Sequence, residues 1–125
     1  MKSFTDQAIW RKSHDLALGI YRATTSFPDL ERDCLVEDLR STALNVETWI
    51  EMGLARRSGL RARSAFGIAT AKLARMESEV ISCKDCKLID SISYRRLTNQ
   101  IDELRKGLWP LAGRRDETIR RNPRR

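Results

Sequence analysis

The sequence predicts an all-α fold, an antiparallel four-helix bundle with up-down-up-down topology. Four stretches repeat their apolar residues with helical spacing, the segments between them are only a few residues long, and no stretch alternates long enough for a strand. Short connections force consecutive helices to be antiparallel neighbours. The helices are predicted at about residues 6–26, 30–53, 58–87 and 91–112.

The first helix carries an apolar stripe and ends at a proline. The stripe consists of Ile9, Leu16, Ile20, Ala23 and Phe27. Pro28 disfavours helical geometry in the residue before it, and Asp29 suits the N-cap of the next helix.

The second helix has two apolar stripes. The main stripe consists of Leu35, Leu39, Thr42, Val46 and Trp49. The other consists of Val36, Ala43 and Ile50, seven residues apart. Gly53 is predicted as the C′ residue that ends this helix, because glycine readily takes a positive φ.

The third helix shows the clearest seam in the chain. Its apolar residues keep heptad spacing at Ala62, Phe66, Ala69, Leu73, Met76, Val80 and Cys83. Ser58 is the predicted N-cap. The fourth helix repeats the pattern at Tyr94, Leu97, Ile101, Leu104, Leu108 and Leu111. Pro110 predicts a kink or fraying after Trp109.

The apolar surface is wider than one narrow stripe per helix. We interpret the surplus either as a subunit interface or as a broad core stripe of a single chain. The residues assigned to the interface are Trp10, Val36, Trp49, Ile50, Leu60, Ile68 and Trp109.

Length and composition indicate one globular domain. The chain has 125 residues, of which 41% are hydrophobic and 33% charged. We expect the bundle at residues 1–113 and a flexible basic tail at 114–125. The sequence shows neither a signal peptide nor a membrane span, and its three cysteines suit reduced thiols, so a cytoplasmic protein is expected.

Charge is distributed unevenly along the chain. The net charge is +7. Residues 29–51 hold seven acids and two bases, whereas residues 54–76 hold six bases and no acid. This distribution suits binding to a polyanion, and it equally suits pairing of an acidic helix with a basic helix of a second copy.

The basic residues are candidates for contact with RNA or DNA phosphates. The candidate set is Arg56, Arg57, Arg61, Arg63, Arg120, Arg121, Arg124 and Arg125. Guanidinium groups bind phosphate through two hydrogen bonds at once, and such binding is largely independent of base sequence. The alternative is a solvated face that pairs with the acidic second helix across a subunit contact.

No catalytic, cofactor or metal site is predicted. Cys83 and Cys86 share one helical face, but a structural zinc site needs four ligands, and Cys83 lies on the core seam. His14 and Asp15 are adjacent, so their side chains diverge and form no dyad. The glycines match no phosphate-binding motif. We therefore expect a protein that is not an enzyme.

The chain resembles the four-helix-bundle proteins related to bacterial 23S rRNA intervening-sequence proteins, also described as ribosomal protein S23-like. The resemblance begins with Trp10, Lys12, Leu16, Ile20-Tyr21, Thr24 and Phe27-Pro28. It continues without a gap to about residue 112, through Glu31-Arg32, Leu39-Arg40, Ile50, Gly53, Arg57-Ser58 and Ile68-Ala69. The family pattern Pro-x-Asn-Ile-Ala-Glu-Gly is replaced here by Glu47-Thr48-Trp49-Ile50-Glu51-Met52-Gly53.

The resemblance implies a small cytosolic bundle. Similar bundles serve as accessory proteins of diversity-generating retroelements, where they form pentamers and bind nucleic acid and a protein partner. By this resemblance we expect a homopentamer that binds RNA or DNA. The alternative is a protein-interaction scaffold that binds an acidic protein partner and no nucleic acid.

Overall fold

The computed structural model describes residues 4–28, 35–56 and 59–113 of the chain. Within these ranges it has four long helices and no strand: α1 Phe4–Thr24, α3 Glu37–Arg56, α4 Leu60–Asp85 and α5 Ser91–Leu111. The all-α prediction and its four helices are therefore confirmed. The predicted start of the second helix near residue 30 lies outside the described residues, as does the predicted tail 114–125.

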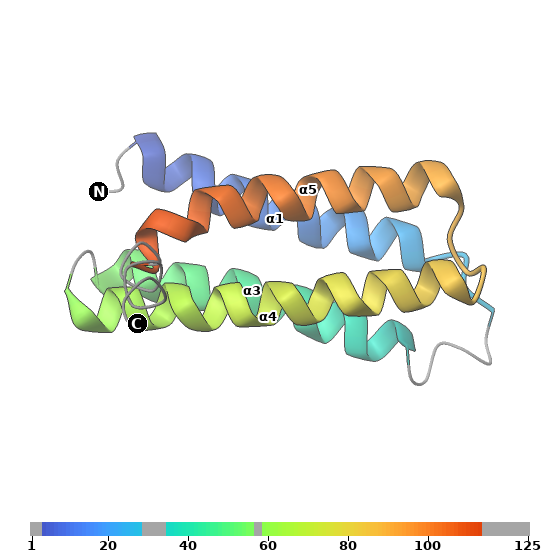
Figure 1. Cartoon of the computed structure of the whole chain (residues 1–125), viewed down its shortest axis with the longest axis horizontal. Coiled ribbons are helices and arrows are strands. Elements are labelled where there is room, and N and C mark those ends of the chain that lie inside the picture. Colours follow the sequence, from blue (N-terminus) through green and yellow to red (C-terminus); the bar gives the residue numbers. More distant parts are fainter. Residues whose placement is uncertain (1–3, 29–34, 57–58, 114–125) are drawn as a thin grey trace, which may run out of the picture.

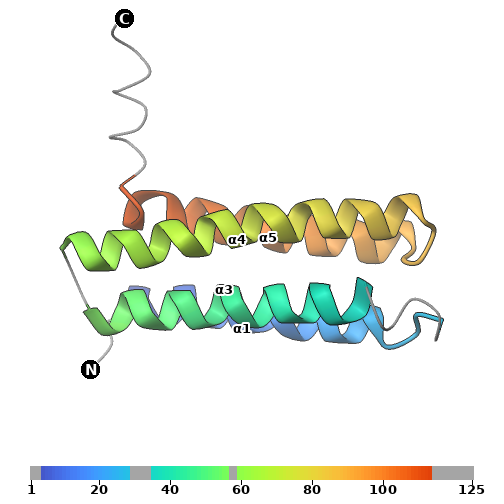
Figure 2. The same cartoon turned by 90° about the horizontal axis from the view of Figure 1, so that it is seen from below.

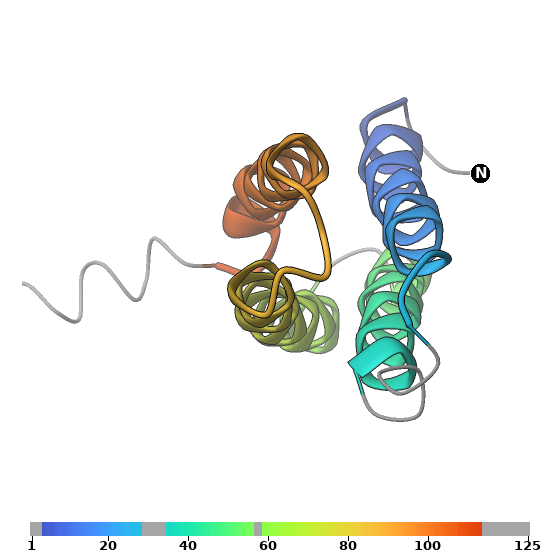
Figure 3. The ribbon, with the colours of Figure 1, turned by 90° about the vertical axis from the view of Figure 1, so that its right-hand side faces the viewer.

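The four helices form an antiparallel bundle in which each one runs opposite to the one before it (Figure 1). Viewed along its length, the bundle has α4 and α5 on one side and α1 and α3 on the other (Figure 3). The view from below shows the same two pairs (Figure 2). Contacts run from α3 to α4, from α4 to α5, and from α1 to both α3 and α5, so the four helices enclose one core.

The core is made by the predicted seams. All seven residues of the α4 heptad pattern are buried, from Ala62 to Cys83, and so are Leu97, Ile101, Leu104 and Leu108 of α5. Apolar side chains removed from water supply the main favourable free energy of such a fold. No helix in the described ranges is long and apolar enough to cross a membrane.

The second apolar stripe of α3 belongs to the core, which corrects part of the predicted interface. Val36, Ala43 and Ile50 are exposed by only 3%, 2% and 0%. The reason is that α3 packs against both α1 and α4, so it buries two of its faces within one chain. The assignment of Val36 and Ile50 to a subunit contact is therefore wrong.

Gly53 does not end its helix, contrary to the prediction. Helix α3 continues to Arg56, and Gly53 lies buried inside it. A Cβ atom at Gly53 would lie 2.6 Å from Cζ of Phe66 on α4. Glycine is needed here for the close approach of two helices, whereas the positive φ of 92° occurs at Gly59, which caps α4. The predicted cap, Ser58, lies outside the described residues.

Pro110 lies inside α5 without ending it. The helix reaches Leu111, and the Ala112 backbone N–H donates to the Leu108 carbonyl at 2.9 Å. Pro110 has no N–H to donate to the Lys106 carbonyl, so one bond of the last turn is missing, but the Ala112 bond continues the helical pattern beyond it. The helix therefore does not fray after Trp109.

Candidate functional site

Three of the predicted phosphate-contacting arginines lie at one end of the bundle, on either side of the α3–α4 turn. Arg56 is in the last turn of α3, and Arg61 and Arg63 are near the start of α4. All three are exposed, and none of their guanidinium groups forms a hydrogen bond or ion pair with another described residue. The other members of the predicted set lie outside the described residues: Arg57, Arg120, Arg121, Arg124 and Arg125.

These arginines surround the start of α4 and do not share one face of it. Arg61 and Arg63 point about 200° apart around the helix, on either side of the buried Ala62. The first turn of α4 contains no acid. Arg56 also has a structural role, because a cation stabilises the negative end of the α3 dipole. The end of the bundle is thus a distributed positive surface.

The remaining predicted interface residues differ in exposure. Leu60 and Trp109 are 75% and 42% exposed. Trp10, Trp49 and Ile68 are half-buried, and the two tryptophans pack against the core. Only Leu60 and Trp109 of the set therefore present large apolar area to solvent.

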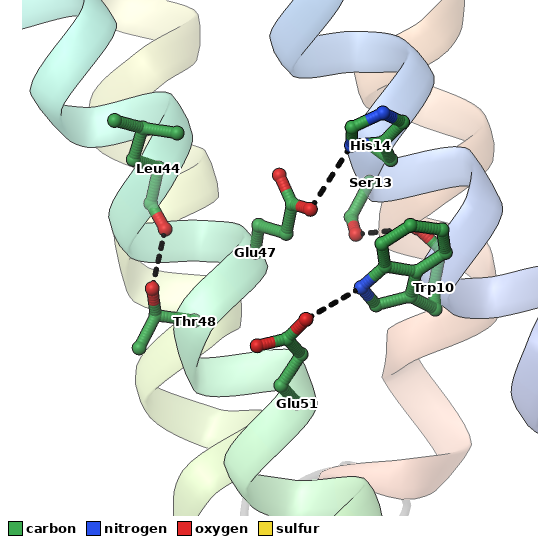
Figure 4. Close-up of polar contacts among 7 residues, drawn as sticks. All are labelled: Trp10, Ser13, His14, Leu44, Glu47, Thr48 and Glu51. Carbon is green, nitrogen blue, oxygen red and sulfur yellow. Dashed lines mark hydrogen bonds and ion pairs between the residues drawn. The ribbon is translucent and has the colours of Figure 1, made fainter.

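A polar cluster that the sequence analysis did not predict joins α1 to α3 (Figure 4). The Trp10 indole N–H donates to Oε2 of Glu51 at 2.9 Å. His14 Nδ1 lies 3.1 Å from Oε2 of Glu47, and its ring stacks on Trp10 with the centroids 4.8 Å apart. The signal in the sequence is the spacing of four residues in each pair, which places both members on one face of a helix.

This cluster holds the two helices together and shows no arrangement for catalysis. His14 Nδ1 contacts Glu47 on α3 and not the adjacent Asp15. The nearby Ser13 hydroxyl donates to the carbonyl of Trp10 at 2.7 Å, so the histidine does not activate it. Glu47 and Glu51 account for two of the acids of the second helix, and they bind within the same chain.

The two cysteines of the Cys83-Lys84-Asp85-Cys86 segment differ in burial. Cys83 is buried, and burial raises the pKa of its thiol to about 11, with smaller contributions from Cys86 and Glu79. Cys86 is exposed, and Cys34 lies outside the described residues. Among the described residues, no group of three or more His, Cys, Asp or Glu side chains is arranged to hold a metal ion.

A half-buried carboxyl group lies on α4. Burial raises the pKa of Glu79, while the nearby Thr42 hydroxyl and Arg75 guanidinium act in the opposite direction. Its Oε1 atom is buried without a hydrogen-bond partner. Arg75 Nε lies 3.5 Å from Oε2 of the same residue, so the side chain is held by its own helix.

The structure thus defines a small helical-bundle protein with exposed arginines at one end, whose guanidinium groups have no partner among the described residues. The chain matches the family model of the 23S rRNA-intervening sequence protein over residues 5–109. It belongs to this family, as its resemblance to these proteins indicated. No curated protein matches it.

Proposed function

We propose that this protein is a non-enzymatic, oligomeric RNA- or DNA-binding accessory protein of the cytoplasm. The exposed arginines at the α3–α4 end carry the proposal. The side chains of Arg56, Arg61 and Arg63 have no partner among the described residues, and no acid lies in the first turn of α4. A guanidinium group without a protein partner is free to bind phosphate, and several such groups give affinity without base specificity.

Assembly into a ring is the second part of the proposal. It is supported by the family resemblance and by the exposed Leu60 and Trp109 at the same end of the bundle. Five copies would bring five sets of arginines together, so weak contacts would add up to tight binding.

The nucleic-acid part of the proposal is tested by measuring how a variant with two arginines replaced binds single-stranded RNA. The variant Arg61→Gln/Arg63→Gln is expected to bind a 20-nucleotide oligouridylate more weakly at every salt concentration. The slope of log affinity against log salt is expected to fall in magnitude by about 1.4, because each phosphate contact on a single strand contributes about 0.7. Fluorescence anisotropy at four salt concentrations measures both quantities.

A matched control separates local contacts from overall charge. Arg95→Gln/Lys106→Gln removes the same two charges from exposed positions on α5. It is expected to leave the salt slope close to that of the native protein. If the Arg61/Arg63 variant has the native slope, or if both variants lose the same slope, the arginines are not the phosphate contacts.

The exposed apolar residues favour a protein-interaction scaffold as the second candidate. Leu60 is 75%, Ile92 69% and Leu44 47% exposed. If the native protein shows no salt-dependent affinity for RNA or DNA and still assembles, the scaffold function replaces nucleic-acid binding.

A further inference from the structure

A surface hollow of about 610 Å³ lies at the opposite end of the bundle from Arg56, Arg61 and Arg63. It is formed where the end of α1 meets the α4–α5 turn and the start of α5, at the end that faces the viewer in Figure 3. Helix α4 separates the two ends by about 39 Å, from its 26 residues. The half-buried Leu88 and Ile89 line the hollow and pack against the core, so part of its wall is rigid.

The hollow has a net positive lining. Its ionisable residues are Arg22, Lys84 and Lys87 against one acid, Asp90. Asp90 is already used as the N-cap of α5, where its carboxylate accepts the Ser93 backbone N–H at 2.7 Å. The side chains of Arg22 and Lys87 form no hydrogen bond or ion pair with another residue that the structure describes.

Further donors surround the same space. The hydroxyl-bearing Ser91 and Ser93 line the hollow beside the N-terminus of α5, where Asp90 is the N-cap. Arg22 also borders a neighbouring hollow of about 480 Å³, where Arg96 adds a second guanidinium group. Cationic and hydroxyl donors therefore converge from three segments of the chain.

Lys87 lies in the α4–α5 turn in a left-handed backbone conformation. Lys87 has a φ of 62°, the left-handed region in which glycine is favoured after a helix. The turn is closed by two bonds at 2.9 Å, from the Lys87 N–H to the Lys84 carbonyl and from the Leu88 N–H to the Cys83 carbonyl. Glycine would adopt this φ with less strain than lysine does.

We propose that this hollow is a phosphate-binding site, with Arg22, Lys84 and Lys87 as the residues that contact the phosphate oxygens. The ligand is either the phosphodiester of a nucleic-acid strand or the terminal phosphate of a nucleotide. Lys84 is held near the site, because its Nζ atom lies 5.1 Å from the centre of the Tyr94 ring. The site does not depend on the arginines of the α3–α4 end.

Chemical-shift titration with three probes tests the site and distinguishes the two ligands. The probes are inorganic phosphate, adenosine monophosphate, and a five-nucleotide oligouridylate without terminal phosphates. Saturable shifts of the backbone amides of Lys87, Ser91 and Ser93 are expected. Saturation by the monophosphate at the lower concentration identifies a nucleotide site, and saturation by the oligonucleotide at the lower concentration identifies a strand site. If none of the probes gives saturable shifts at these amides, the proposal is wrong.

Substitution tests the named residues. Arg22→Gln/Lys87→Gly is expected to weaken binding of the best probe by at least about tenfold, because two charge-assisted contacts are lost. The glycine suits the backbone at position 87, so thermal unfolding is expected at or above the native temperature. Arg95→Gln/Lys106→Gln, with the same loss of charge, is expected to change affinity less than twofold. An equal loss of affinity in both variants would show that the probe is attracted by the overall charge of the protein, and the proposed site would be wrong.

The two proposals fail separately. Arg22→Gln/Lys87→Gly leaves Arg56, Arg61 and Arg63 intact, so its loss of probe binding supports the hollow even where Arg61→Gln/Arg63→Gln leaves the RNA salt slope unchanged. Arg61→Gln/Arg63→Gln is expected to leave the amide shifts of the α4–α5 turn unchanged. If this second variant abolishes them, the hollow is not an independent site.

Discussion

At the scale of single residues, glycine positions show how closely the helices approach. Gly53 faces the Phe66 ring, and a Cβ atom there would lie 2.6 Å from it. Gly67, on α4, has no heavy atom within 4 Å of the corresponding position. Both glycines lie within helices, so substitution by alanine has the same effect on helix propensity at each. The two positions differ in the room available for a methyl group.

Gly53→Ala is expected to lower the free energy of unfolding by about 1–3 kcal/mol, because the core must shift to admit a methyl group. Gly67→Ala is expected to raise it by about 0.5–1 kcal/mol, since alanine favours a helix interior over glycine. Urea unfolding of both variants measures the difference. Equal stability of the two variants would contradict the close approach.

The buried thiol of Cys83 gives stability a pH dependence. Burial raises the pKa of its thiol to about 11 in the folded protein, whereas the pKa of a cysteine in an unfolded chain is about 8.5. Between these values the unfolded chain has released a proton that the folded chain still holds. Stability attributable to this residue is therefore complete below about pH 8.5 and is lost as pH rises toward 11.

The stability difference between the native protein and Cys83→Ala tests this dependence. The native advantage is expected to decrease by roughly 3 kcal/mol between about pH 8 and pH 11. Because other groups titrate in both proteins, their contributions cancel in the difference. Denaturant unfolding across this range provides the measurement, and a difference that stays constant with pH would contradict it.

At the scale of helices, α1 and α3 are joined by more than apolar packing. Trp10 donates to Glu51, and Arg40 Nε donates to Oγ1 of Thr24 at 2.9 Å while its guanidinium group lies 4.5 Å from the centre of the Tyr21 ring. Polar contacts at two places along the pair fix their register, because a shift by one turn would break both. Between α4 and α5, Arg105 acts similarly through its bond to Glu77 at 2.6 Å.

A double-mutant cycle measures the α1–α3 bond. Trp10→Phe and Glu51→Gln are expected to show a coupling energy of about 0.5–1 kcal/mol in unfolding, the range of a partly exposed hydrogen bond to a charged group. The cycle is required because Trp10 also packs against the core. A parallel cycle with Glu37→Gln, at the far end of α3, is expected to show no coupling. A similar coupling energy in both cycles would mean that the Trp10–Glu51 hydrogen bond is not its cause.

At the scale of the whole molecule, the two most exposed apolar residues, Leu60 and Ile92, lie at opposite ends of the bundle. Leu60 and Trp109 are near the end that carries Arg56, whereas Ile92 is in the first turn of α5 at the other end. Of these three residues, Leu60 and Trp109 belong to the interface that the sequence predicts and Ile92 does not. This separation allows the two ends to be tested independently.

Light scattering is expected to give a native mass close to five times the 14.4 kDa of the chain. Leu60→Gln/Trp109→Gln is expected to reduce it, because a polar side chain buried in a subunit contact without a partner is unfavourable. Ile92→Gln serves as the control, with a mass equal to that of the native protein. A native mass of one chain would rule out the oligomer.

Much of the fold could be predicted from the sequence. Heptad spacing in α4 identifies every one of its seven seam residues as buried, because a helix presents every third or fourth residue to one side. The interface could be predicted only in part. Val36 and Ile50 have the same spacing whether their stripe faces another chain or a second helix of this one.

The sequence by itself determined four amphipathic helices, their approximate bounds and the family to which the chain belongs. These follow from local periodicity and from residues in an ungapped register. Tertiary structure decided that Gly53 meets Phe66, that Glu51 meets Trp10, and that Arg22 comes beside Lys87. Such pairs are distant in the chain, and only the packing of helix on helix brings them together.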